Sequence, residues 1–489
     1  MQEGIVVWDC GATNASVLLV ALDGRVLGSK SRPTDAANTE DGLVWPVERF
    51  WVHFCELTRE LLSEHEAEPR AVNITTFGVC WGAVDAQGEL VYPVISWKCQ
   101  RTQEQLEWAE GRLDLDAVYE QTGAPPFYFN TAFSLRWLRD RRPEILDKAD
   151  AFLMMPQLFV ERLTGERAAE QTMATTSMLY DLERNAWAEE LFEAFDVPNK
   201  FPKRVVCPGD IAGEVRQEVS KISGLPAGTP VCAGGHDTAV AVAGACRDLR
   251  ESLLYSTGTW SILVGSRDEA AASSAQRRRN ILWQRNPQNE GVLGGFNIQG
   301  HMIGGLAFDL VRRMWLPGAS AAEASALAAE AEPGSGGVLI NPTFVAGTGP
   351  NPQVPSAVLG WADGMEPGNA VRAVLEGIAC QTRDSKEAMG AEPASLLVGG
   401  GFAKNELFGQ ILADVLDMPV ELSGAAEVTA LGAAALALVG IGAVDSAEEA
   451  WKLLETPTKQ FEPKSESVEA YERLYARRRR LMEALEDEA

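Results

Sequence analysis

The chain has 489 residues and a formal net charge of −26, with 43 lysines and arginines against 69 aspartates and glutamates. Its apolar share of 46% and charged share of 23% are typical of a soluble globular protein, and its length predicts two or three domains. So acidic a chain repels nucleic acid and anionic membranes, so we predict neither as a partner. A nucleotide site would need backbone N–H groups and a metal ion rather than a basic cleft.

The cysteines and the N-terminus indicate a reducing, cytoplasmic compartment. No two of the eight cysteines form a CxxC pair, so zinc and thioredoxin-type sites have no support. Residues 1–7 lack a basic segment and a long apolar run, which argues against a signal peptide. The apolar run at 428–444 is mostly Ala and Gly, and it predicts a buried helix rather than a membrane span.

The first 200 residues predict an α/β core with a helical insertion at about 100–200. The chain begins with a β-hairpin, and Asp23-Gly24 leads into a third strand. A turn at Cys80-Trp81-Gly82 is expected to close a later strand. The predicted strands cover 5–8, 16–22, 25–31 and 71–79, and the predicted helices cover 50–64, 104–112, 134–141 and 157–163.

A second strand–turn–strand unit begins near residue 252 and has the same pattern as the N-terminal hairpin. It predicts an internal duplication with a boundary near 245–250. The strands of this second unit are predicted at 253–255 and 260–264. A later strand at 395–398 precedes an amphipathic helix at 405–417.

Arginine runs at 277–279 and 477–480 could suggest nucleic-acid binding. The second run lies in a predicted C-terminal helix that begins near Ser467 and carries many glutamates. A solvated, salt-bridged helix face is therefore the better interpretation, and we apply the same interpretation to the first run.

The tetrapeptide Gly235-His236-Asp237-Thr238 lies between a predicted strand at 230–234 and a small apolar helix at 239–245. An Asp at such a junction is a common helix cap. A carboxylate there can also accept the proton of a substrate hydroxyl, as kinases of small hydroxyl compounds require, while His236 could donate to a sugar oxygen. The residues alone leave both roles open.

Two hairpin turns have the composition of phosphate-binding loops. In the turn at 9–14, Gly11 permits close approach of the backbone, Thr13 adds a hydroxyl donor and Asp9 could hold Mg²⁺. The turn at 256–259 offers the same chemistry. An ordinary hairpin explains either turn alone, but two of them could hold both ends of a triphosphate.

Three glycines at 399–401 follow a strand and precede a helix that begins near Asn405. They would let a flat ring or a ribose approach the backbone, so we predict a nucleoside site there. The spacing is not GxGxxG and the motif lies late in the chain, which disfavours a dinucleotide fold.

These motifs, with residues 75–79 and 92–102, occur in an order that resembles the FGGY family of carbohydrate kinases from residue 9 to about 440. The resemblance implies an α/β fold of two actin-like (ribonuclease H-type) lobes with a central cleft for sugar and ATP. The N-terminal lobe, residues 1–246 with the helical insertion, would bind the sugar. The C-terminal lobe, residues 247–489, would bind the nucleotide.

The resemblance also assigns roles to single residues. Asp237 would be the catalytic base, with His236 beside the sugar. Trp81, Lys98 and Arg101 would lie along the sugar side. The remaining residues would bind Mg²⁺ and ATP: Asp9, Gly11, Thr13 and Asn14 in one phosphate and metal turn, Thr257, Gly258 and Thr259 in the other, and Gly400, Gly401 and Asn405 at the adenosine.

Two departures from the family pattern bear on the substrate. The family usually has an Arg where this chain has Ser16, and a missing guanidinium would weaken phosphate binding by about 1.5–3 kcal/mol. The most similar members continue Phe77-Gly78-Val79 with Asp-Gly, where this chain has Cys80-Trp81. A thiol and an indole thus replace a carboxylate, and Trp81 could either stack on a sugar or fill core.

The resemblance therefore implies ATP-dependent phosphorylation, with Mg²⁺, of a hydroxyl of a small ketose similar to L-fuculose. A kinase for another ketose or polyol, such as rhamnulose, xylulose or ribulose, is the alternative within the family. A catalytically silent sugar sensor or an ATPase is the alternative outside it. A homodimer is also compatible with the sequence.

Overall fold

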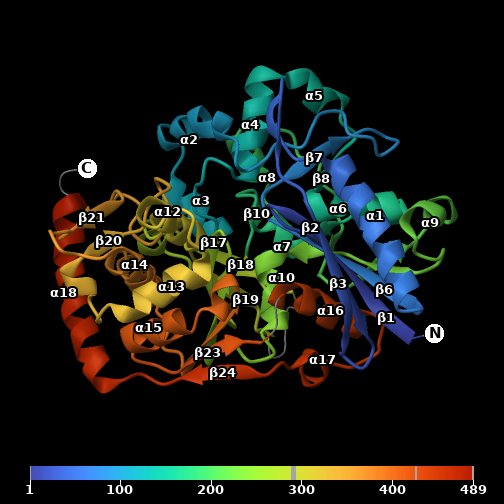
Figure 1. Ribbon diagram of the computed structural model, residues 1–489. Helices are drawn as coiled ribbons and strands as arrows, with labels where there is room; N and C mark the ends of the chain where they lie inside the picture. The colour runs from blue at the N-terminus through green and yellow to red at the C-terminus, as the bar shows by residue number, and fades with distance from the viewer. Residues whose placement is uncertain (1, 288–292, 425–426, 487–489) are drawn as a thin grey trace.

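The computed structural model describes residues 2–287, 293–424 and 427–486, and it has two α/β lobes side by side (Figure 1). The central strand of the first sheet, β1, pairs antiparallel with β2 and parallel with β6. The sheet has the order β13-β14-β6-β1-β2-β3, with β15 also paired to β6. Its strands are β1 (Gln2–Cys10), β2 (Asn14–Ala21), β3 (Val26–Pro33), β6 (Ala67–Thr76), β13 (Ile211–Glu214), β14 (Pro230–Cys232) and β15 (Gly235–His236).

The second sheet repeats this plan. The run β19-β17-β16-β22-β23 matches β3-β2-β1-β6-β14 in order and in the direction of each pair, which supports the expected duplication. Two further strands, β18 and β24, extend its edges. The strands are β16 (Ser252–Thr257), β17 (Trp260–Arg267), β18 (Ile281–Arg285), β19 (Phe296–Ile303), β22 (Ser395–Gly400), β23 (Val420–Ser423) and β24 (Thr458–Phe461).

Helices cover each sheet with the apolar faces that their sequences predict. In the first lobe, α1 (Val47–Glu64) buries Phe50, Phe54, Leu57 and Leu61 in one core with β1 and β6. In the second, α14 (Pro367–Ala388) and α15 (Glu406–Leu416) pack into a core with the sheet. Further helices are α6 (Met155–Thr164), α9 (Gln217–Ser223), α12 (Gly305–Trp315), α13 (Ala321–Glu330), α17 (Ala447–Leu454) and α18 (Ser465–Glu486).

The helical segment at 100–200 has a hydrophobic core of its own. Three of its helices, α2, α4 and α5, lie at the top of the view in Figure 1. The predicted helices at 104–112, 134–141 and 157–163 are present as α2, α4 and α6 within a few residues. The segment contains α2 (Gln103–Glu110), α3 (Leu115–Thr122), α4 (Thr131–Arg141), α5 (Pro143–Lys148), α7 (Gln171–Ala174) and α8 (Glu189–Ala194).

The turn predicted at Cys80-Trp81-Gly82 is wrong. These residues begin a strand, β7 (Trp81–Val84), which pairs with β8 (Ala151–Met154). The chain turns earlier, because β6 ends at Thr76 and Val79 adopts a left-handed φ of 61°.

The arginine run in α18 is not uniformly solvated. Arg478 is 2% exposed and forms an ion pair with Asp384 of α14 at 2.6 Å. It lies three residues after Tyr475, on the face that packs against the core, so helical spacing buries it. No helix among the described residues is long and apolar enough to cross a membrane.

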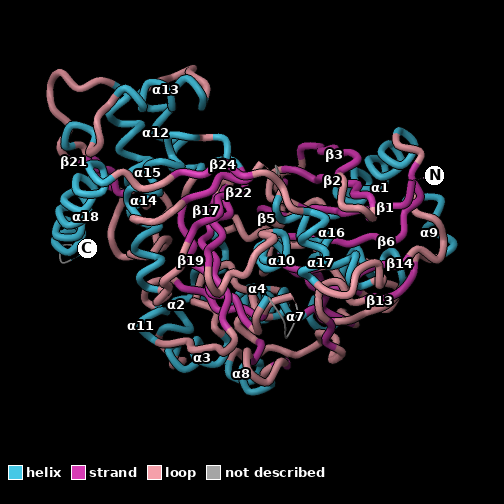
Figure 2. The backbone as a smooth tube through the Cα atoms, turned by 90° about the horizontal axis from the view of Figure 1, so that it is seen from below, coloured by secondary structure: helices cyan, strands magenta, loops and turns pink. Residues whose placement is uncertain are grey.

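Two helices cross between the lobes. Helix α10 (Asp237–Gly244) follows the last strand of the first sheet, and α16 (Val428–Gly440) follows β23 of the second. They share one apolar cluster with strands of both sheets, and Figure 2 shows α10, α16 and α17 close together between the lobes. The side chain of Asn73 in β6 also donates to the carbonyl of Ala433 at 2.8 Å. Helix α10, whose first residue is Asp237, therefore packs against elements of both lobes.

Candidate active site

Asp237 is the first residue of α10, and its side chain is 35% exposed. Its Oδ1 accepts hydrogen bonds from Thr238 N at 2.6 Å and Thr238 Oγ1 at 3.1 Å. Its Oδ2 has no hydrogen bond to any described residue. The helix cap position belongs to His236, so Asp237 does not act as the N-cap residue. One carboxylate oxygen is thus anchored and the other is available to a substrate.

His236 lies against Asp237 and against the segment that follows β6. Its Nε2 is 3.2 Å from Asp237 Oδ1, and its backbone N donates to Thr172 Oγ1 at 2.9 Å. A Cβ added at Gly78 would lie 3.0 Å from Nε2 of His236 and 2.9 Å from Thr176. Glycine at position 78 therefore leaves room for the imidazole beside Asp237.

The first hairpin turn joins β1 to β2 and brings Asp9 near Asp237. Gly11 N donates to Asn14 O at 2.9 Å, which closes a tight turn with Thr13 and Asn14 exposed. Burial, followed by the charges of Asp237 and Glu427, raises the pKa of Asp9 to about 8. Ser16 is the cross-strand partner of Asp9, so an Arg at that place would lie beside this carboxylate.

The carboxylates near the first turn would fit a magnesium site only if substrate phosphates completed it. Within the described ranges, no group of three His, Cys, Asp or Glu side chains is close enough to hold a metal by itself. Mg²⁺ usually keeps several waters and is held by one or two carboxylates together with substrate phosphates. Asp9 suits that role, because its charge is disfavoured by burial and by two neighbouring acids until a cation balances it. One oxygen of Glu427 is also buried and has no hydrogen-bond partner among the described residues.

Lys98, predicted on the sugar side, contacts the first hairpin turn. Its Nζ donates to the carbonyl of Ala12 at 3.0 Å and to Asp35 at 2.7 Å. The ammonium lies over the rings of Trp45, at 5.4 Å, and Trp97, at 5.8 Å. The turn that lacks an Arg at position 16 therefore has a lysine at its edge.

The second hairpin turn and the triple glycine are joined by Thr257. Its hydroxyl donates to Gly399 O at 2.5 Å and accepts from Phe402 N at 3.0 Å, so it is used within the protein. Gly400 has a φ of 81°, and a Cβ there would lie 2.0 Å from Thr257 O. Only glycine fits this close approach. Within the second turn, Gly258 and Thr259 are the exposed residues.

A cavity of about 730 Å³ lies beside this second turn. Gly258 and Thr259 line it from the turn, and Gly401 and Asn405 line it from the glycine motif. Asn405 also caps α15 by accepting from Phe408 N at 3.1 Å. Two motifs almost 150 residues apart thus meet at one concave site of the size that a nucleoside needs. Sequence reasoning missed other residues that line this cavity, among them Leu306, Phe308, Ala322 and Ser325.

A second cavity, of about 1040 Å³, is lined by residues of both halves of the chain. Trp97, Phe127 and Phe129 come from the first half, and Thr259 and Trp260 from the second. The ring of Trp97 lies 6.3 Å from Phe129 and 6.4 Å from Trp260. Sequence reasoning missed these aromatic residues, although Trp97 precedes Lys98 and Trp260 follows the second turn.

The other two residues predicted on the sugar side have structural contacts. Trp81 is 7% exposed, donates to Ser134 Oγ at 2.7 Å and packs against Phe152 at 4.8 Å, which favours a core role. The guanidinium of Arg101 lies 4.6 Å from the ring of Trp137, and its Nε is 3.2 Å from Cys99 Sγ. These contacts do not support a sugar role for Trp81 or Arg101.

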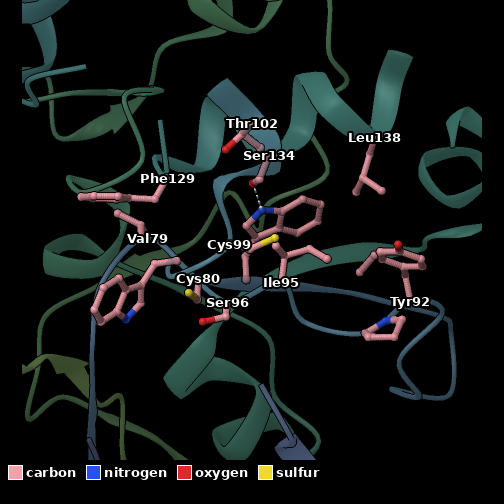
Figure 3. Close-up of a pocket in the computed structure, with 14 residues that line it drawn as sticks. Val79, Cys80, Tyr92, Ile95, Ser96, Cys99, Thr102, Phe129, Ser134 and Leu138 are labelled. Atoms are coloured by element: carbon pink, nitrogen blue, oxygen red, sulfur yellow. Dashed lines mark hydrogen bonds between the residues drawn. The ribbon is translucent and has the colours of Figure 1, made fainter. Parts of the chain in front are cut away.

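Cys80, the other departure from the family pattern, is also buried. Its thiol accepts from Trp45 Nε1 at 3.3 Å, and burial raises its pKa to about 12. Figure 3 shows it at a small cavity beside Val79, Ser96 and Phe129. At about 30 Å³ this cavity is too small for a sugar.

Comparison with known proteins identifies the family. The N-terminal domain of the FGGY family of carbohydrate kinases matches residues 4–244, and its C-terminal domain matches residues 253–441. L-fuculokinase of Escherichia coli (strain K12) is 32% identical over 484 residues, covering 95% of this chain and 98% of that protein.

Solved structures show the same fold. The ligand-bound xylulose kinase from Lactobacillus acidophilus has a TM-score of 0.90 at 18% identity, covering 99% of this chain and 98% of that one. The Plasmodium falciparum glycerol kinase with ADP has a TM-score of 0.84 at 20% identity, covering 97% and 98%. The two lobes are therefore actin-like, and the chain belongs to the FGGY family of carbohydrate kinases.

Proposed function

We propose that the protein transfers the γ-phosphoryl group of ATP to a hydroxyl of a small ketose similar to L-fuculose, with Asp237 as general base. The observation that carries this proposal is the state of the Asp237 carboxylate at the start of α10. Its Oδ1 is anchored by Thr238, and its Oδ2 has no described partner. A carboxylate held in this way can take the hydroxyl proton without moving.

The two hairpin turns support phosphoryl transfer at this place. The turn at Gly11–Asn14 would hold the terminal phosphate, with Lys98 adding a positive charge at its edge. The turn at Gly258 and Thr259 would hold the other phosphates, with adenosine in the cavity beside Gly401 and Asn405. Mg²⁺ held through Asp9 would neutralise charge on the phosphate oxygens. The hydroxyl then attacks in line while its proton passes to Asp237 Oδ2.

The aromatic residues of the larger cavity support a sugar with an apolar face. Trp97, Phe129 and Trp260 offer flat apolar surfaces from both halves of the chain. A deoxy ketose such as L-fuculose has a methyl group that suits such a surface, and a relative with 32% identity bears the name L-fuculokinase. Neighbours named xylulose kinase and glycerol kinase make a pentulose or a polyol the alternatives.

ADP release over a panel of acceptors tests the proposal. The panel contains L-fuculose, L-rhamnulose, D-xylulose, D-ribulose, glycerol and a reaction without sugar. We expect the highest kcat/KM for L-fuculose. Release without sugar would instead indicate an ATPase, and no release with any acceptor would favour a sugar sensor.

The variant Asp237→Asn tests the base. Asparagine keeps an oxygen that can accept from Thr238 N, so α10 and nucleotide binding should be preserved. We expect turnover to fall by roughly 10²–10⁴-fold, with an ATP affinity by calorimetry close to that of the unaltered protein. Near-normal turnover would exclude Asp237 as the base.

We further propose that the protein works in the cytoplasm. Cys55, Cys80 and Cys232 are buried, and burial raises the pKa of each thiol to about 12. Buried thiols of this kind are typical of a reducing compartment. A homodimer stays a prediction, and light scattering on the purified protein would test it.

A further inference from the structure

His301, in β19, lies beside both the aromatic cavity and the candidate base. Its ring is 6.4 Å from the ring of Phe127, nearly parallel to it, and 6.5 Å from that of Trp260. Both of these residues line the cavity of about 1040 Å³. His301 also interacts electrostatically with His236, whose Nε2 is 3.2 Å from Asp237 Oδ1. His301 is therefore close to the place where the proposed sugar would bind.

Two buried amides near His301 have fixed orientations. Gln284 Nε2 donates to the backbone carbonyl of Thr172. Asn297 Nδ2 donates in the same way to the carbonyl of Arg285, at 3.2 Å. Because a backbone carbonyl can only accept, reversing either amide would set oxygen against oxygen. The side-chain oxygens of Gln284 and Asn297 are therefore acceptors for their other neighbours.

Gln299 transmits this direction to His301. Its Nε2 lies 2.8 Å from Gln284 Oε1 and 2.5 Å from Asn297 Oδ1, so this nitrogen is the donor in both contacts. Its Oε1 therefore faces His301 Nε2, at 2.8 Å, and must accept from it. The three amide side chains are 0% exposed, so bulk water offers them no other partner. The hydrogen of His301 is thus on Nε2.

The other ring nitrogen of His301 is left as an acceptor. Burial, and then the nearby His236, lower the pKa of His301 to about 3, so the ring is neutral near pH 7 and carries one hydrogen. With that hydrogen on Nε2, Nδ1 keeps a free lone pair. Nδ1 makes no hydrogen bond to a described residue, yet it is not one of the fully buried unpaired atoms, so it is accessible to a ligand.

We propose that His301 is a sugar-binding residue whose Nδ1 accepts a hydrogen bond from a sugar hydroxyl other than the one that Asp237 deprotonates. This inference rests on the proposed function. A bare ring nitrogen binds a hydroxyl and rejects a carbonyl oxygen, because two acceptors share no hydrogen. Phe127 and Trp260 would hold an apolar face of the sugar without fixing its rotation. The contact with His301 supplies that orientation.

Nitrogen NMR of the imidazoles tests both the tautomer and the contact. The chain has four histidines, so ¹⁵N-histidine labelling gives few signals, and the variant His301→Gln removes those of His301. In the sugar-free protein at neutral pH, we expect a hydrogen on Nε2 and none on Nδ1. Addition of L-fuculose should shift the Nδ1 signal. A hydrogen on Nδ1 in the sugar-free protein, or an Nδ1 signal that L-fuculose leaves in place, would overturn the proposal.

Two substitutions separate the sugar contact from the packing of the ring. His301→Gln keeps a nitrogen that can donate to Gln299 Oε1 but removes Nδ1, so the Kd for L-fuculose by calorimetry should rise roughly tenfold while Tm is kept. His301→Asn keeps an oxygen near the place of Nδ1 but leaves Gln299 Oε1 without its donor. This variant should keep the Kd within about threefold and lower Tm by a few degrees.

His65→Gln, the same change at the end of α1, is the matched control and should keep both quantities. Loss of sugar affinity in proportion to Tm in the two His301 variants would show a packing role and overturn the proposal. Sugar binding is measured without ATP, so it is independent of the ADP-release panel. Binding through His301 without ADP release would refute the proposed function alone, and ADP release with an unshifted Nδ1 signal would refute this inference alone.

Discussion

The crossing of α10 and α16 predicts that one methyl group far from the substrate lowers turnover. A Cβ at Gly432 would lie 2.1 Å from the carbonyl oxygen of Val240, where 3.4 Å is an ordinary contact. On the other helix, a Cβ at Gly244 would lie 1.9 Å from Val428 O. The variant Gly432→Ala must therefore move the helices apart by about 1.3 Å at this point. Asp237 is the first residue of the helix that moves.

The expected size of the effect follows from that shift. A misplacement of about 1 Å can reduce a rate by roughly 10²-fold, so we expect kcat to fall by one to two orders of magnitude. Overpacking costs roughly 1–3 kcal/mol, and the higher helix propensity of Ala offsets about 1 kcal/mol of it. The net loss of up to about 2 kcal/mol should lower Tm by a few degrees.

Steady-state ADP release with the best sugar and saturating ATP measures kcat, and calorimetry measures Tm. Gly111→Ala is the matched control, because a Cβ there meets its nearest atom at 3.7 Å and the residue has a φ of −84°. We expect this control to keep both kcat and Tm. An unchanged kcat in Gly432→Ala with a lowered Tm would refute the argument that the crossing sets the position of the base.

Two further predictions concern Lys98 and Glu170. Lys98→Met should raise KM for ATP about tenfold at saturating sugar, because the first turn loses its ammonium, and Lys30→Met, which removes an ammonium paired with Glu60 and Glu64, should not. Burial raises the pKa of Glu170 from an ordinary 4.5 to about 8. The folded state therefore keeps a proton that the unfolded state loses, so stability falls as pH rises across this window. Glu170→Gln should flatten the fall in unfolding free energy between about pH 5 and about pH 8, measured in urea, and an unaltered slope would contradict the assignment.

Sequence reasoning predicted backbone features that depend on residues close together in the chain. The turns at Gly11 and Gly258, the glycine motif and Asp237 each lie within a short segment whose residue types suit one backbone conformation. It failed where a side chain depends on a distant partner. Arg478 is buried because Asp384, 94 residues earlier, faces it, and Gln284 of the second sheet lies 3.1 Å from His236 Nδ1. Trp97 and Trp260 form one cavity wall only after the halves of the chain meet.

The charges around Ser16 bear on the expected departure from the family pattern at that position. The first turn lies near Asp9, Asp237 and Glu427, whose mutual repulsion contributes to the raised pKa of Asp9. A chain with a net charge of −26 adds no attraction for a polyanion. Lys98 offsets part of this charge at Ala12, but it is already paired with Asp35. Under the proposed function, the remaining balance would come from the cation that accompanies ATP, so we expect the site to discriminate against metal-free ATP more strongly than a site with an arginine at that turn.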